Sequence, residues 1–206
     1  SIYNLTDHLL VWHGYSNVLC LTGPEENYEA KIRAEGFISA MEDNGIDWHG
    51  RIIYGDFWRY TAAKLAEKIA SGEMKCPEAV VCTNDIMAVA LCQELQKRGL
   101  KGPRDVAVTG YDGSVFTLLT KPAITTVCGG DMCLGKNAVK TLAEMLKIRC
   151  DIDCGNVHIR VGGSCGCFNE QGEKDALLEQ TEKMLYRQLD RKNFMFSNYI
   201  VRMSDC

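Results

Sequence analysis

The sequence lacks the signals of a membrane, secreted or nucleic-acid-binding protein. No run of about 18 apolar residues is present, so we expect no membrane-spanning helix. The first residues, SIYNLTDHLL, show neither the basic region nor the small-residue cleavage site of a signal peptide. Lys and Arg form no basic stripe and the formal net charge is −4. Because phosphate contacts need clustered positive charge, we expect no nucleic-acid binding through this segment.

The chain also lacks the motifs of common enzyme and nucleotide-binding sites. It has no P-loop and no GxGxxG, so the turns that hold a phosphate are missing. The histidines, His8, His13, His49 and His158, are scattered and form no HExxH pair. We therefore expect a protein that is not an enzyme and that needs no cofactor.

Cysteine, in contrast, is abundant, with eleven residues in the chain. Several of them, such as Cys20, Cys82 and Cys92, lie in apolar runs, where free Cys behaves as a small hydrophobic residue. This usage favours a reducing cytoplasm over an oxidising compartment.

Four cysteines near a Gly-rich turn raise the question of a zinc site. Three residues separate Cys150 from Cys154, and one residue separates Cys165 from Cys167. These spacings do not match the C-x2-C knuckles of zinc sites, and a predicted strand lies between the two pairs. We therefore predict no metal site, although Cys165 and Cys167 can pair or oxidise if the turn is exposed.

Short apolar runs alternate with helix-length segments along most of the chain. With 206 residues the chain can bury a real core in one or two domains. The alternation predicts an α/β fold, a parallel sheet with right-handed crossovers. The predicted strands cover 16–23, 51–56, 78–83, 105–112, 123–128 and 156–163, and the predicted helices cover 4–14, 27–44, 61–70, 85–98 and 134–146.

Two acid-bearing turns follow neighbouring predicted strands. Asn84 and Asp85 stand where one strand ends and its helix begins, and Asp112 ends the next strand. Ligands of open parallel sheets bind at this edge, and an amide beside a carboxylate suits a polyhydroxylated ligand such as a sugar. Taken singly, Asp85 is also typical of a helix cap and Asp112 of a turn.

Aromatic and cationic side chains are predicted at the same edge. Phe57 and Trp58 follow a strand in the run GDFW, and an aromatic face can stack on a sugar ring. One of the two can equally belong to the core or a lid. Arg33 lies between Ile32 and Ala34, where a guanidinium could grip a hydroxyl pair or a carboxylate, or neutralise a nearby Glu.

These segments together resemble the ligand-binding core of the lac-repressor family, whose members are similar to periplasmic sugar-binding proteins. The resemblance rests on DHLLVWHGYSNVLCLTGPEENYEAKIRAEGF, GDFW, CTNDIMAVALCQELQKRGLKGPRDVAVTGYDGS and PAITTV, and it covers about residues 1–165. It implies a two-lobed clamshell that closes on a small effector. The effector-contact positions of the family correspond to Arg33, Phe57, Asn84 and Asp112, with Asp85 supporting the turn. Trp58, next to Phe57, is a further supporting candidate.

The resemblance also implies how the chain divides. It begins about halfway through the family fold, so we expect the first part of the N-terminal lobe and a DNA-binding helix-turn-helix to lie outside it. Residues 1–121 would form the C-terminal lobe and 122–149 a strand and helix of the N-terminal lobe. Residues 150–168 would contain the return strand and the Gly/Cys-rich boundary, and 169–206 a long helix for signalling or oligomerisation.

The last segment predicts a partner. Leu178, Leu185, Leu189, Phe196 and Met203 follow an approximate heptad seam, which favours a helix that pairs with a second chain, although packing on its own globule would cover the same residues. We expect a homodimer.

The sequence therefore predicts a cytoplasmic module that binds a small, polar, carbohydrate-like effector. Its output would be transcription, with DNA bound only by a domain outside this chain, or a signalling domain that follows the tail helix. The alternative is an extracytoplasmic solute-binding protein of a sugar transporter, which predicts disulfide-bonded cysteines.

Overall fold

The computed structural model describes residues 1–129, 134–149 and 157–167. The chain divides into two units, Ser1–Phe168 and Asn169–Cys206. The second unit lies outside the described residues, so the predicted tail helix and its dimer seam stay predictions.

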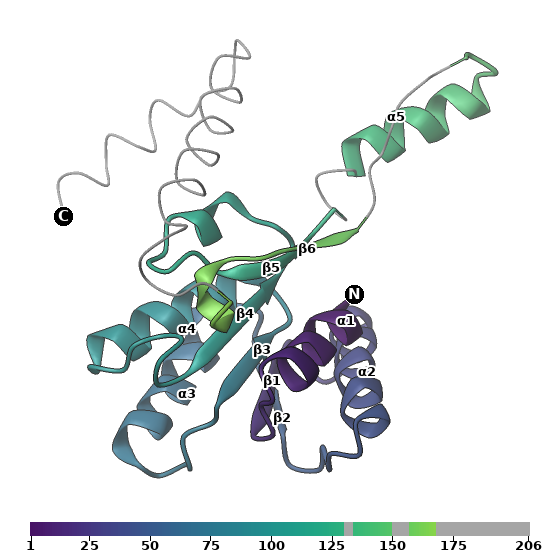
Figure 1. The fold of residues 1–206 in the computed structure, drawn as a ribbon. Coiled ribbons are helices and arrows are strands. Elements are labelled where there is room, and N and C mark those ends of the chain that lie inside the picture. The colour runs from purple at the N-terminus through teal and green to yellow at the C-terminus, as the bar shows by residue number, and fades with distance from the viewer. Residues whose placement is uncertain (130–133, 150–156, 168–206) are drawn as a thin grey trace, which may run out of the picture. The chain divides into compact units, whose positions relative to one another are not determined.

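Within the described residues, the strands form one mostly parallel sheet (Figure 1). The order across the sheet is β2-β1-β3-β4-β5-β6. All neighbouring pairs are parallel except β5 and β6, which pair antiparallel. The parallel α/β fold that the sequence predicts is confirmed. The strands are β1 (Val18–Thr22), β2 (Ile52–Tyr54), β3 (Ala79–Cys82), β4 (Ala107–Tyr111), β5 (Thr125–Cys128) and β6 (His158–Arg160).

Helices cover both faces of this sheet because the strand residues alternate between two cores. Leu19 and Leu21 pack with the helices α3 and α4, whereas Val18 and Cys20 pack on the opposite face with α1 and α2. None of the described helices is both long and apolar enough to cross a membrane. The helices are α1 (Ile2–Asp7), α2 (Tyr28–Asp43), α3 (Arg59–Ser71), α4 (Asp85–Lys97) and α5 (Leu134–Met145), with a π-helix at η1 (His8–Trp12) and 3-10 turns at η2 (Val115–Leu118) and η3 (Gly163–Cys165).

The strand β5 corrects one predicted boundary. The sequence prediction placed residues 122–149 in the other lobe, but Thr125 pairs with Thr109 of β4, and all of β5 is buried in the main sheet. An apolar, β-branched strand buries more surface between two neighbours than at an exposed edge. The β5 strand therefore belongs with residues 1–121, while the assignment of α5 to a second lobe stays a prediction.

The Gly-rich segment after β6 is held against the sheet by buried hydrogen bonds. Ser164 Oγ donates to the Val108 carbonyl and accepts from the Thr125 amide. Thr125 Oγ1 also donates to the Gly162 carbonyl at 3.0 Å. These bonds fix η3, and with it Cys165, beside β4 and β5.

Candidate functional site

The predicted site residues meet at the carboxyl ends of the parallel strands. Asn84 follows β3 and begins α4, and Asp112 directly follows β4. Asp112 has a φ of 114°, a conformation that side chains other than Gly, Asn and Asp rarely adopt. The carboxylate is therefore presented by a turn that the backbone adopts at a cost.

Arg33 connects the two acid-bearing turns. Its Nη1 donates to the Thr83 carbonyl at 2.7 Å and lies 3.6 Å from Asp112 Oδ1. Its Nη2 bonds Glu29 Oε2 at 2.6 Å, and the guanidinium lies 4.3 Å from the centroid of the Tyr111 ring. The Arg33 side chain is 17% exposed. The structure thus brings Arg33, Asp112 and the start of the Asn84 turn together, as the sequence predicts.

Asn84 is a helix cap as well as a site residue. It is 7% exposed, and its Oδ1 accepts from the Met87 amide at 2.8 Å. Its Nδ2 donates to the Phe57 carbonyl at 2.9 Å. One amide hydrogen and one lone pair of Asn84 are left for a ligand. The side chain therefore links the loop after β2 to the start of α4.

The two aromatic residues of GDFW have different surroundings. The Phe57 ring packs on the core around α3 and α4, and it lies so close to Gly23 that a Cβ there would be 2.2 Å from the ring. Trp58 is 64% exposed. The expectation that one of the two packs in the core is met by Phe57, which is partly buried, while Trp58 offers the larger exposed aromatic surface.

Asp85 is buried behind the two acid-bearing turns, where its carboxyl accepts hydrogen bonds. It is 1% exposed, and its carboxyl accepts from the Ser114 amide and the Thr126 hydroxyl, each at 2.6 Å. These bonds tie the start of α4 to the turn after Asp112 and to β5. Burial, the largest cause, raises the pKa of Asp85 to about 6. The predicted supporting role of Asp85 stays a prediction, which the stability measurements below can test.

The raised pKa predicts a pH-dependent stability. An Asp in an unfolded chain titrates near pH ~3.9, whereas burial raises the pKa of Asp85 to about 6. Between these values the folded state keeps a proton that the unfolded state has released, so the free energy of unfolding falls as the pH rises. We expect a fall of up to about 3 kcal/mol from this group.

The measurement is urea unfolding between pH 4 and pH 7 for the wild type and for Asp85→Asn, which cannot titrate. Only the difference between the two proteins reports on Asp85, because groups such as Glu94 act in the opposite direction. Hydrogen bonds from Lys97 and Arg98 lower the pKa of Glu94 to about 2. A difference that stays constant across this pH range would contradict the prediction.

An open hollow of about 280 Å³ lies beside Arg33. Arg33 and Tyr111 form part of its wall, whereas Phe57, Asn84 and Asp112 do not line it. Of the predicted ligand-binding residues, only Arg33 therefore borders this hollow. The hollow is lined further by Ser1, Ile2, Tyr3, Tyr28, Glu29, Ile32 and Gly36.

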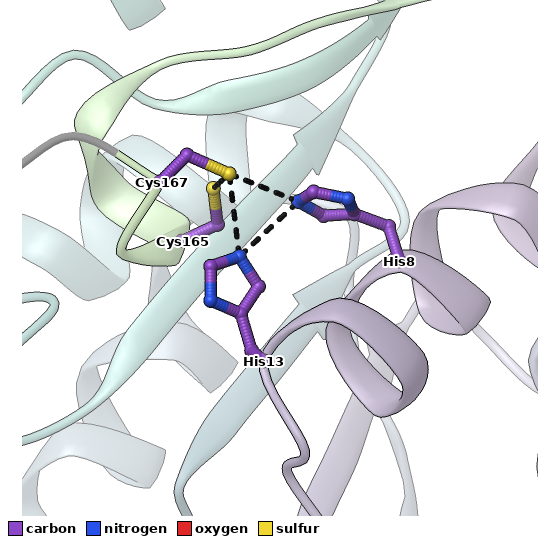
Figure 2. Close-up of side chains that lie close together, drawn as sticks. All are labelled: His8, His13, Cys165 and Cys167. Atoms are coloured by element: carbon purple, nitrogen blue, oxygen red, sulfur yellow. Dashed lines mark hydrogen bonds between the residues drawn. The ribbon is translucent and has the colours of Figure 1, made fainter.

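A second group of side chains, missed by the sequence prediction, gathers at η1 and η3. His8 and His13 lie next to Cys165 and Cys167, and the four ligand atoms lie within 4.8 Å of one another (Figure 2). The sequence prediction grouped Cys165 and Cys167 with Cys150 and Cys154, which lie outside the described residues. The sequence does place His8 and His13 only five residues apart, but only the fold brings them next to Cys165 and Cys167.

Comparison with known proteins supports the same kind of domain. The family model of the periplasmic binding protein-like domain matches residues 6–160. The HTH-type transcriptional repressor PurR of Aliivibrio fischeri (strain MJ11) is 36% identical over 147 residues, which cover 70% of this chain and 43% of that protein. The chain thus spans less than half of this relative's length.

Solved structures share the fold. A LacI-family transcriptional regulator from Sanguibacter keddieii superposes with a TM-score of 0.68 at 25% identity, over 80% of this chain and 63% of that one. The lac repressor dimer bound to operator and the anti-inducer ONPF gives a TM-score of 0.68 at 20% identity, over 80% of this chain and 49% of the other.

Proposed function

The chain belongs to the family of periplasmic binding protein-like domains, as a lac repressor-like effector-binding domain, and from this membership we propose that it senses a small polar effector for a transcriptional regulator. The effector would bind at the carboxyl ends of β1, β3 and β4. The observation that carries the proposal is that Arg33 contacts both acid-bearing turns, through the Thr83 carbonyl and Asp112.

The chemistry of these groups favours a carbohydrate-like effector. Arg33 supplies donors, Asp112 supplies acceptors and Asn84 supplies both, which matches hydroxyl groups that donate and accept at once. The exposed indole of Trp58 offers a flat surface for the apolar face of a sugar ring. Both features support a neutral polyhydroxylated ligand.

The output and the partners follow from the same membership. We propose a homodimer that regulates transcription in the cytoplasm through a DNA-binding domain outside this chain. A signalling domain reached through residues 169–206 is the other form of output. The relatives and solved structures above are transcriptional regulators or repressors, so the transporter alternative is not favoured.

The proposed site is tested by Asp112→Gly in the full-length protein. Glycine removes the carboxylate and, unlike alanine, adopts the φ of 114° without strain. A panel of neutral mono- and disaccharides is first ranked by thermal shift of the wild type. We expect the sugar that gives the largest shift to bind Asp112→Gly about 10- to 100-fold more weakly in calorimetric titration, a loss of about 1–3 kcal/mol.

Asp47→Ala is the matched control, because Asp47 is an exposed carboxylate that pairs only locally with His49. It should leave the affinity unchanged. Equal affinity of Asp112→Gly and wild type would contradict the site, and the absence of any shift across the panel would contradict the carbohydrate class. If Asp112→Gly unfolded the protein, Asp112 would have a structural role in its turn rather than a role in ligand binding.

A further inference from the structure

Two histidines and two cysteines from opposite ends of the described chain form one cluster. His8 Nε2 and His13 Nε2 lie 3.3 Å apart. Cys167 Sγ lies 3.2 Å from His8 Nε2 and 3.3 Å from His13 Nε2, and 3.2 Å from Cys165 Sγ. Figure 2 shows both imidazoles and both thiols pointing into the same small space. His13 and Cys167 are 154 positions apart in the sequence, so the fold alone brings the groups together.

The π-helix η1 explains why the two histidines face the same side. Residues five apart on an α-helix are separated by about 140° around its axis, given ~3.6 residues per turn. A π-helix bonds residue i to residue i+5, which brings such residues onto one side, and π-turns often occur at functional sites. His8 begins η1 and His13 follows its end. The wider turn thus points both imidazoles toward η3.

On the other side of the cluster, contacts from Thr125 and Tyr15 fix the position of Cys165. Cys165 is buried, and its Sγ lies 3.0 Å from Thr125 Oγ1, which can donate its one hydrogen either to this sulfur or to the Gly162 carbonyl. The Cys165 carbonyl accepts from Tyr15 Oη at 3.2 Å, and the Tyr15 ring stacks on His13 with centroids 5.3 Å apart. A hydroxyl that donates to a sulfur is the kind of outer contact that stabilises a metal-bound thiolate.

We propose that His8, His13, Cys165 and Cys167 bind a zinc ion. In tetrahedral zinc sites with Zn–N of about 2.05 Å and Zn–S of about 2.3 Å, the ligand atoms lie about 3.3 Å apart for N and N, about 3.6 Å for N and S and about 3.8 Å for S and S. The separations of 3.3 Å between the nitrogens and of 3.2 Å and 3.3 Å from nitrogen to Cys167 Sγ are close to these values. The two sulfurs are 3.2 Å apart, about 0.6 Å closer than in such a site, so zinc binding would require them to separate.

The two thiols and two imidazoles favour zinc over other metals, and the distance between the sulfurs disfavours a disulfide between Cys165 and Cys167. Two thiolates with two imidazoles in a tetrahedron are typical of zinc, whereas magnesium and calcium require oxygen ligands. A disulfide needs sulfurs about 2.05 Å apart, but Cys165 and Cys167 are free thiols separated by 3.2 Å. Zinc binding would release one proton from each thiol to solvent, and each imidazole would bind through its neutral nitrogen.

Zinc at this position would join η1 to the segment that follows β6. A metal that closes a loop of this length removes much conformational freedom from the unfolded chain, so its binding free energy adds to the stability of the fold. The ion would hold the end of the described chain on the N-terminal helix. This role is separate from effector binding at the strand ends, since none of the four ligands lies there.

The test is metal analysis of the full-length protein after expression with zinc and gel filtration. We expect one zinc ion per chain by plasma mass spectrometry. Cobalt(II) in place of zinc should give the thiolate charge-transfer and d–d absorption of a tetrahedral thiolate site. Cys167→Ser and His8→Ala remove exposed or partly exposed ligands, and each should weaken zinc about 100-fold or more, beyond the ~10–100-fold that outer contacts contribute.

Cys76→Ser and His49→Ala are matched controls, because both residues are exposed and lie outside the cluster. Both should keep one zinc ion and the cobalt spectrum. The proposal would be overturned if the wild-type protein bound no zinc, or if its cobalt form lacked the spectrum of a tetrahedral thiolate site. So would full zinc occupancy in the double variant Cys167→Ser/His8→Ala, or a Cys165–Cys167 disulfide in protein isolated under reducing conditions.

Discussion

Replacing Asp85 with Ala should lower the free energy of unfolding by about 3–4 kcal/mol at pH 5, since two buried donors lose their acceptor at about 1–3 kcal/mol each. The donors are the Ser114 amide and the Thr126 hydroxyl, each 2.6 Å from the carboxyl. A cavity beside Gly110 adds to the cost, because a Cβ at Gly110 would lie 2.2 Å from Asp85 Oδ1. Urea unfolding followed by circular dichroism measures the loss.

The control for Asp85→Ala is Asp47→Ala, which removes an exposed carboxylate and should change the free energy of unfolding by less than about 0.5 kcal/mol. A loss below about 1 kcal/mol for Asp85→Ala would mean that water or another side chain satisfies both donors. In that case the assignment of Asp85 as a support would be wrong.

The network around Asp85 shows why the sequence could predict the sheet edge but not the role of each residue on it. The alternation of strands and helices determines that Asn84 and Asp112 end neighbouring parallel strands, so their proximity follows from the topology. Whether a carboxylate is buried depends on residues far away in the chain. Thr126 lies 41 positions from Asp85, and nothing near Asp85 in the sequence indicates this partner.

The cluster of His8, His13, Cys165 and Cys167 could not be predicted from the sequence, for a similar reason. In the sequence, the spacings C-x3-C and C-x-C differ from the C-x2-C pairs of zinc sites, so they argue against a metal. The structure instead combines Cys165 and Cys167 with two histidines from the start of the chain. A helix was predicted over 4–14, but on an ideal α-helix His8 and His13 would face different sides. The π-helix that unites them is not encoded in the apolar pattern.

The position of β5 shows a third limit. The sequence predicts a buried strand over 123–128, so the pairing of Thr125 with Thr109 could have been predicted from it. The family resemblance places a lobe boundary before this strand, whereas the strand pattern alone gives no lobe boundary. Hydrogen bonds of the Gly162–Cys167 segment to β4 and β5 now make the same strand part of the central packing.

The Gly162→Ala variant should lose about 3 kcal/mol of its free energy of unfolding, the upper end for overpacking a closed site. A Cβ at Gly162 would lie 2.3 Å from the Ala123 carbonyl oxygen and 2.8 Å from its carbon, so the backbone entering β5 must move. That movement would strain the bonds of Thr125 to the Gly162 amide and carbonyl, at 2.9 Å and 3.0 Å. Urea unfolding with and without EDTA measures the loss.

Gly135→Ala is the matched control, since a Cβ there meets nothing within 4 Å, and alanine in a helix should stabilise by up to about 1 kcal/mol. The chelator separates steric from metal effects. The Gly162→Ala loss should persist in EDTA, because the collision with Ala123 does not involve an ion. The loss caused by Cys167→Ser should vanish in EDTA, because wild type and variant then both lack zinc. If Gly162→Ala matched wild type in both conditions, the segment would not be docked on β5 as the structure has it.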